Sequence, residues 1–180
     1  MPHTRQSPPS SLERYFTYRL NTLAKLNDLA SQNLYLKEGG LSLSASRALA
    51  SIGSFPQITV NQLAFEANLD KGQASRAAQS LVDQGLVIKT HNLVDGRSVI
   101  LALTPKGKPV WRKLMALIEQ RNQALTSCLT PEERAQLIDM FERMQAQAQA
   151  DFAGDDAEET SASKVTPRRP ARSGAPSPAP

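Results

Sequence analysis

The sequence predicts a mainly α-helical protein in which a β-hairpin follows two short helices and longer helices flank this unit. Three observations lead to this prediction. Apolar residues recur at three- and four-residue spacing over much of the first 150 residues. Two β-rich segments, 86–90 and 98–103, lie on either side of an Asp-Gly pair, which is a hairpin turn signal. Aromatic residues make up only 5% of the chain, which suits helices that pack through Leu and Ala.

Length and composition limit the class of protein. The 180 residues are enough for one domain with a core, together with terminal segments. The single cysteine, Cys128, excludes an intramolecular disulfide framework. No apolar run approaches the ~18 residues of a membrane span, and the N-terminus lacks the apolar core of a signal peptide. We therefore expect a soluble, cytoplasmic protein.

Positive charge is concentrated in one segment of the chain. The net charge is +4 overall, whereas residues 71–113 alone carry eight basic and two acidic residues. A concentrated basic region is the electrostatic footprint expected of a nucleic-acid binder. A solvated helix face is the alternative explanation of such a charge cluster, so the surrounding elements decide between the two.

The N-terminal part predicts one long helix. Residues 1–10 are polar and rich in proline, and we expect no ordered structure there. An amphipathic helix is predicted over 12–36, and Gly39-Gly40 would end it. A stripe this rich in leucine favours a subunit interface, with packing inside one monomer as the alternative. The stripe consists of Leu12, Phe16, Leu20, Leu23, Leu26, Ala30 and Leu34.

Two further helices are predicted from their capping residues. Ser42 can cap a helix over 43–51, on which Ala45 and Leu49 would face inward. Thr59 can cap a short helix over 60–66, and Gln62, three residues later, completes a capping box. Asn68-Leu69 then forms a tight turn into the next helix.

The helix that follows has two distinct faces. Asp70 is a good N-cap and Gly85 a good C′ residue, so a helix is predicted between them. At 100° per residue, one arc is small and apolar and consists of Ala74, Ala77, Ala78 and Leu81. The short helix and this one form a helix-turn-helix pair.

The opposite arc suits DNA. An ordinary surface helix favours acidic residues in its first turn, whereas this one has Lys71 and Arg76 and no acid before Asp83. Arg pairs with guanine, Gln with adenine and Ser with either. The candidate DNA contacts on this helix are Lys71, Gly72, Gln73, Ser75, Arg76, Gln79 and Ser80.

The hairpin after this helix specifies the fold further. A hairpin directly after a helix-turn-helix pair makes a winged helix-turn-helix, here predicted over 42–104 with a two-stranded β wing. Arg97 lies near the tip of this wing, where a side chain can reach an adjacent minor groove. Lys89 and Arg97 keep the wing positive, so we add both to the candidate DNA contacts.

Two long helices are predicted after the wing, over 105–148 in total. Thr104-Pro105 begins the first as cap and first helical residue, and Pro109 removes a backbone donor, so we expect a kink or a frayed first turn. Thr130-Pro131, with Glu133 in a capping box, begins the second. From residue 151 to 180, Pro, Ala, Ser and charge replace large apolar residues, and we expect a disordered tail.

Together these motifs resemble the MarR (multiple antibiotic resistance regulator) family. The matching segments are 70–76, 81–87, 95–99 and 103–107. They correspond to the recognition helix, the entry to the wing, the Asp-x-Arg wing tip and the Leu-Thr-x-x-Gly that opens the penultimate helix. The resemblance covers about residues 12–148, within a domain over 11–150.

The resemblance implies a homodimer whose terminal helices, 12–36 and 105–148, interlock. Each recognition helix would enter a major groove of double-stranded DNA, with Arg97 in the minor groove and held in place by Asp95. Two-fold symmetry then predicts a pseudo-palindromic operator with half-sites about one helical turn apart.

The resemblance also implies regulation by a small molecule. Members of the family commonly repress their own or adjacent genes, and many release DNA when a small aromatic or phenolic acid binds between the dimer helices and the DNA-binding lobe. From the location of that pocket, the candidate effector-binding residues are Tyr15, Tyr18, Arg19, Arg47 and Phe55.

Catalytic and metal-binding chemistry is poorly represented. His3 lies in the N-terminal segment and His91 in the wing, and neither has a Cys or acidic partner at ligand spacing. We assign no metal, no cofactor and no enzymatic activity, since no phosphate-binding or dinucleotide-binding glycine pattern is present either. Cys128 is interpreted as a small buried apolar residue, with an oxidant-sensing thiol as the alternative.

The main hypothesis is therefore a ligand-responsive transcriptional repressor. An architectural DNA-binding protein without an effector is one alternative, and its binding would show little sequence preference and a steep salt dependence. A winged helix used only for protein interaction is another, although charge is normally depleted at the core of a protein interface. Effector, operator, target genes and the choice between repression and activation stay open.

Overall fold

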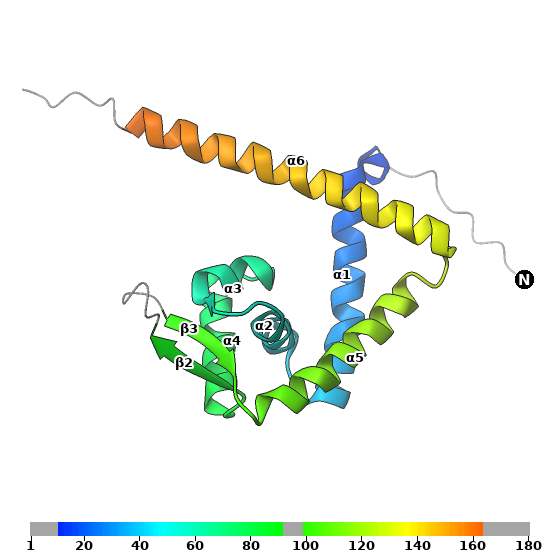
Figure 1. Ribbon diagram of the computed structural model, residues 1–180. Helices are drawn as coiled ribbons and strands as arrows, with labels where there is room; N and C mark the ends of the chain where they lie inside the picture. Colours follow the sequence, from blue (N-terminus) through cyan, green and yellow to red (C-terminus); the bar gives the residue numbers. More distant parts are fainter. Residues whose placement is uncertain (1–10, 92–98, 164–180) are drawn as a thin grey trace, which may run out of the picture. The chain divides into compact units, whose positions relative to one another are not determined.

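The computed structural model describes residues 11–91 and 99–163, and the chain divides into two units between Ser127 and Cys128. The first unit contains ten of the described elements and the second contains one long helix (Figure 1). In chain order they are η1 (Leu12–Arg14), α1 (Phe16–Leu34), η2 (Tyr35–Gly39), α2 (Leu43–Ser54), β1 (Ile58–Thr59), α3 (Val60–Glu66), α4 (Lys71–Asp83), β2 (Val87–His91), β3 (Val99–Leu103), α5 (Gly107–Leu125) and α6 (Pro131–Ser163).

The predicted helix over 12–36 is interrupted near its start. Tyr15 has extended backbone angles, φ −74° and ψ 137°, so η1 is a separate 3₁₀ turn and α1 begins at Phe16. At its other end α1 continues into a single π-helical turn, η2. Gly40 then takes a left-handed conformation with φ 67°, which ends the helix at the predicted pair of glycines.

The predicted caps of the next helices are confirmed. The Ser42 hydroxyl accepts a hydrogen bond from the Ala45 backbone N–H at 3.2 Å, and α2 extends to Ser54, beyond its predicted end. Thr59 and Gln62 form the expected capping box at the start of α3. Asn68 turns the chain with a positive φ of 51° and leads into α4.

The wing is part of a three-stranded sheet, whereas the sequence predicted two strands. β2 and β3 form the expected antiparallel hairpin, with Val87 opposite Leu103. The additional strand, β1, pairs with the other edge of β3 and places Ile58 opposite Leu101. Two residues are too short to show an alternating pattern, so β1 could not be predicted from the sequence, although Ile58 is buried.

The core of the first unit is built around α2. Figure 1 shows α2 at the centre of this unit, and it packs against α4, α5, α3 and β3. Ala48 and Leu49 of α2 are completely buried, as are Leu63 and Leu81 from the two helices that follow. The indole N–H of Trp111 on α5 donates to the Ala50 carbonyl at 3.3 Å, which ties α5 to the same core.

The start of α5 differs from its prediction. The helix begins at Gly107, two residues after Pro105, although Thr104 still caps this turn by accepting a hydrogen bond from the Gly107 N–H at 2.9 Å. Pro109 therefore lies in the first turn of α5, where backbone N–H groups have no partner within the helix. Its missing N–H removes no helical hydrogen bond there.

The second unit contains α6, which begins as predicted. The Thr130 N–H donates to the Glu133 carboxylate at 2.8 Å, and the Glu133 N–H donates to the Thr130 hydroxyl at 3.2 Å. The predicted end near Ala148 is wrong, because α6 continues to Ser163, into the segment expected to be disordered. Residues 149–163 contain several Ala and Glu and no Pro, so they can extend a helix without burying apolar surface.

Two further sequence expectations concern exposure. Cys128 is exposed, so its interpretation as a buried residue is wrong; it follows the end of α5, where little else covers it. Among the described helices, none combines the length and the apolar character that a membrane crossing requires.

The contact between α5 and the entry to the wing gives a stability prediction. A Cβ at Gly107 would lie 2.0 Å from the Leu86 carbonyl oxygen, a backbone atom that cannot move without displacing β2. We expect Gly107→Ala to lower the free energy of unfolding by about 1–3 kcal/mol through overpacking. Urea denaturation measures this change. Gly39→Ala is the matched control, because its nearest neighbour would be Leu117 Cδ1 at 3.9 Å, and equal midpoints for both variants would contradict the prediction.

Candidate nucleic-acid interface

The two faces predicted for α4 are present in the structure. Ala74, Ala78 and Leu81 are completely buried and Ala77 is 5% exposed, so the apolar arc packs inward. The candidate DNA contacts on the other arc are all exposed, namely Lys71, Gly72, Gln73, Ser75, Arg76, Gln79 and Ser80. The helix therefore presents a continuous polar surface with two basic residues to solvent.

The end of α4 sets the direction of the wing. Gly85 has a positive φ of 70°, and its N–H donates to the Val82 carbonyl at 2.8 Å. The Leu86 N–H donates to the Leu81 carbonyl at 2.9 Å. These two bonds form a Schellman motif, which satisfies the last carbonyls of α4 and turns the chain directly into β2.

The first turn of α4 is capped without using the side chain of Arg76. The Asp70 carboxylate accepts from the Gln73 N–H at 2.7 Å, and the Gln73 amide oxygen accepts from the Asp70 N–H at 3.3 Å. Gln73 is thus used in a capping box as well as being exposed. A Cβ at Gly72 would lie 3.2 Å from Arg76 Nη1, so the guanidinium of Arg76 lies over this first turn. Among the described residues, Arg76 makes no hydrogen bond or ion pair.

Two of the other candidate contacts are joined to each other. The Lys89 ammonium on β2 donates to the Gln79 amide oxygen at 2.7 Å, and the Gln79 amide nitrogen donates to Asp83 Oδ1 at 2.7 Å. Ser80 accepts from the Gln84 amide at 3.2 Å through its hydroxyl. Lys89 is therefore held against the outer face of α4.

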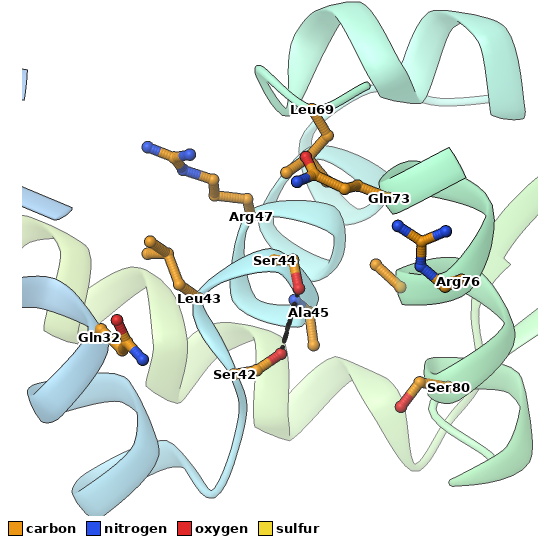
Figure 2. A pocket seen from close by; sticks show the side chains of 11 residues that line it. Gln32, Ser42, Leu43, Ser44, Ala45, Arg47, Leu69, Gln73, Arg76 and Ser80 are labelled. Atoms are coloured by element: carbon orange, nitrogen blue, oxygen red, sulfur yellow. Dashed lines mark hydrogen bonds between the residues drawn. The ribbon is translucent and has the colours of Figure 1, made fainter. Parts of the chain in front are cut away.

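An open cavity of about 460 Å³ adjoins the recognition helix. Figure 2 shows Gln73, Arg76 and Ser80 of α4 along one side, opposite the beginning of α2. Ser42 and Ser44 lie on that opposite side and were missed by the sequence analysis, which treated Ser42 only as a cap. Their position beside α4 depends on how α2 and α4 pack, which cannot be predicted from the local sequence.

A second cavity of about 290 Å³ lies among α1, α2, α5 and the end of α3, where Glu66, Ala67 and Asn68 line it. Arg47 on its wall forms an ion pair with Asp28, with Nη2 and Oδ1 2.5 Å apart. The hydroxyl of Ser46, a completely buried residue, has no hydrogen-bond partner among the described residues. Tyr35, in the π-helical turn, also lines this inner cavity. A polar, partly unsatisfied lining of this kind suits a small polar ligand.

Of the five predicted effector-binding residues, Arg47 lines both cavities. The other four do not line either of them. Tyr15, Tyr18 and Phe55 are exposed, and Arg19 Nε donates to the Glu13 carbonyl at 2.9 Å. The α1 residues on the inner cavity come from its C-terminal half, beginning at Asn27, whereas the predicted residues lie near its start.

Two predicted wing contacts lie outside the described residues. Asp95 and Arg97 fall within 92–98, so their roles stay predictions. In the described part of the chain, no group of three or more His, Cys, Asp or Glu side chains is arranged to hold a metal ion.

Comparisons with known proteins agree with this fold. A family model described as the MarR family matches residues 39–98, from the end of η2 to the residue before β3. The HTH-type transcriptional regulator BilQ of Clostridium symbiosum (strain WAL-14163) is 28% identical over 109 residues, which are 61% of this chain and 76% of BilQ. The chain belongs to the MarR family. It is a transcriptional regulator of the winged-helix type, and the curated relatives that match it are transcription regulators as well.

Solved structures place this MarR-family chain among known winged helices. A MarR-family regulator from Silicibacter pomeroyi is 27% identical with a TM-score of 0.67, covering 76% of this chain and 92% of its own. BpsR of Bordetella bronchiseptica, studied for regulation of its DNA binding by 6-hydroxynicotinic acid, has a TM-score of 0.66. It covers 77% of this chain and 98% of its own at 17% identity, so this second likeness shows the fold.

In this MarR-family chain, the guanidinium of Arg76 is unpaired among the described residues, which gives a prediction about DNA binding. Arg76→Ala is expected to weaken binding to a specific operator by about 1–3 kcal/mol and to relax preference at one base position, because a bidentate contact to guanine is lost. Titration of the operator and its single-base variants measures both effects. Lys71→Ala serves as the comparison, because losing a phosphate contact is expected to weaken binding by the same amount on all sequences. A loss with Arg76→Ala that is equal on all sequences would contradict base recognition.

Proposed function

We propose that the protein is a homodimeric repressor that binds a pseudo-palindromic operator and releases it when a small effector binds. The single observation that carries the DNA-binding part is the outer face of α4, which is polar, basic and continuous, with Arg76 unpaired among the described residues. In this proposal the winged helix, 42–104, contacts DNA, with Arg97 in the minor groove and Asp95 beside it.

Exposed apolar side chains support the homodimer. On α1, Leu23, Leu26 and Leu29 are each about half exposed, although a leucine stripe on a helix is normally buried. On α6, within the second unit, Ile138, Met140 and Met144 are exposed as well. Monomeric proteins rarely expose contiguous apolar patches of this kind. A second copy of the chain that packs against the terminal helices would cover them and would give the two-fold symmetry of the operator.

The inner cavity supports regulation by a small molecule. Its wall contains a cation, Arg47, and an unpartnered buried hydroxyl, Ser46, which can bind a carboxylate and a polar substituent. BpsR, a structural neighbour, is regulated by 6-hydroxynicotinic acid, which carries both groups on one aromatic ring. We infer that the effector of this protein is a small acid of similar size, and that it competes with Asp28 for Arg47.

The experiment that tests this function is footprinting on the DNA that flanks the gene, with an unrelated fragment as the control, at two salt concentrations. A protected two-fold site of roughly two helical turns is expected, because each half of a dimer occupies one half-site. Equal, salt-labile binding to both fragments would contradict the proposal and favour an architectural protein. Absence of binding to either fragment at low salt would favour a protein-interaction module.

The same assay tests the effector. A panel of single-ring aromatic carboxylic acids is expected to contain a compound that releases the operator. Ser46→Ala should then require more of this compound, without loss of stability, because the hydroxyl that it removes has no partner in the described part of the chain. An unchanged response of Ser46→Ala would place the effector elsewhere, and failure of the whole panel would contradict an acid effector.

A further inference from the structure

Gln79 is held between side chains from two different elements. It lies on the outer face of α4, where its amide nitrogen donates to Asp83 one turn later at 2.7 Å. Its amide oxygen accepts from the ammonium of Lys89 on β2, also at 2.7 Å. Figure 1 shows β2 beside α4, and the two elements are in contact. The result is a chain of hydrogen bonds from the wing to the recognition helix.

This arrangement leaves half of the amide available. A glutamine amide has two N–H donors and an oxygen with two lone pairs. Asp83 uses one donor and Lys89 uses one lone pair, so, within the described part of the chain, one donor and one acceptor stay free on an exposed side chain. Adenine presents the complementary pair in the major groove, an N7 acceptor and an N6 amino donor, and Gln is a side chain that pairs with it in this way.

The charges of the two flanking residues suit a position close to DNA. Asp83 is four residues after Gln79 and therefore lies on the same arc of α4, where a carboxylate alone would be repelled by phosphates. Lys89 brings an opposite charge to the same hydrogen-bonded chain. An acid on this face is consistent with a role in orienting Gln79, since Asp83 accepts from its amide nitrogen.

We propose that Lys89 and Asp83 are positioning residues that orient the Gln79 amide to recognise an adenine in each operator half-site. The adenine lies close to the base contacted by Arg76, because Arg76 and Gln79 are neighbours on the same helix face. This inference rests on the proposed function, in which α4 enters the major groove. It assigns Lys89 a role in base recognition, whereas its charge alone had made it a general candidate DNA contact.

The test is selection of binding sites from randomised double-stranded DNA with the full-length protein and its variants. The wild type is expected to prefer adenine at one position of each half-site by about tenfold or more, the discrimination typical of one bidentate contact. Gln79→Ala should lose this preference. Lys89→Met and Asp83→Ala should each reduce it at the same position, whereas Asp83→Asn, which keeps an oxygen acceptor, should retain most of it.

A double variant separates positioning from an independent contact. Gln79→Ala/Lys89→Met should show the same base preferences as Gln79→Ala, because Lys89 acts on this position through the amide. Lys71→Met is the matched control for the loss of one positive charge on this surface and should leave the adenine preference unchanged. Urea denaturation of each variant should give wild-type midpoints, since hydrogen bonds between exposed side chains contribute little to folding.

Three results would overturn the inference in distinguishable ways. If Lys89→Met weakens binding equally on all sequences, lowers the salt slope by about one and keeps the adenine preference, Lys89 is a phosphate contact. If the wild type is sequence-specific but Gln79→Ala has unchanged preferences, the inference fails and the proposed function stands. If the wild type selects no sequence at all, both fail.

Discussion

The close packing of α4 against α2 is the constraint on which the rest of the DNA-binding unit depends. The inner arc of α4 consists of three alanines and Leu81, and all four are buried. Because methyl groups fill little space, the two helices approach closely, and the polar arc of α4 is directed outward. A larger residue at Ala74 or Ala78 would displace α4 and would change the open cavity beside Ser42 and Ser44.

A continuous series of backbone contacts carries this placement into the wing and into α5. The Schellman motif at Gly85 turns α4 into β2, and Leu86 then accepts from the Thr104 N–H at 3.0 Å. Thr104 caps the next helix, and Gly107 packs against the Leu86 carbonyl. Lys106 Nζ also donates to the Gln84 carbonyl at 2.8 Å. The recognition helix, the wing and α5 are thus joined at one point.

The sequence predicted the features that depend on neighbouring residues. The caps at Thr59, Asp70 and Thr130 and the left-handed Gly85 each depend on side chains or backbone within four residues, and each is present. The two faces of α4 followed from helical periodicity alone. These local signals were enough to place the candidate DNA contacts of α4 on one exposed surface.

Features that depend on contacts between distant segments were missed. β1 is identified only by its pairing with Leu101, and the ion pair between Asp28 and Arg47 joins residues of two helices. Four of the five predicted effector residues do not line the inner cavity, because its walls are set by how α1, α2, α3 and α5 pack. The hydrogen bond between Lys89 and Gln79 likewise depends on the angle between α4 and the wing, which residue spacing in the sequence does not predict.

Methylation interference on the operator determines whether the outer face of α4 enters the major groove, as we propose. Guanine N7 lies in the major groove and adenine N3 in the minor groove. Methylation at N7 is expected to block binding at two clusters about one helical turn apart, related by two-fold symmetry. Binding that is insensitive to N7 methylation throughout the protected site would contradict this proposal.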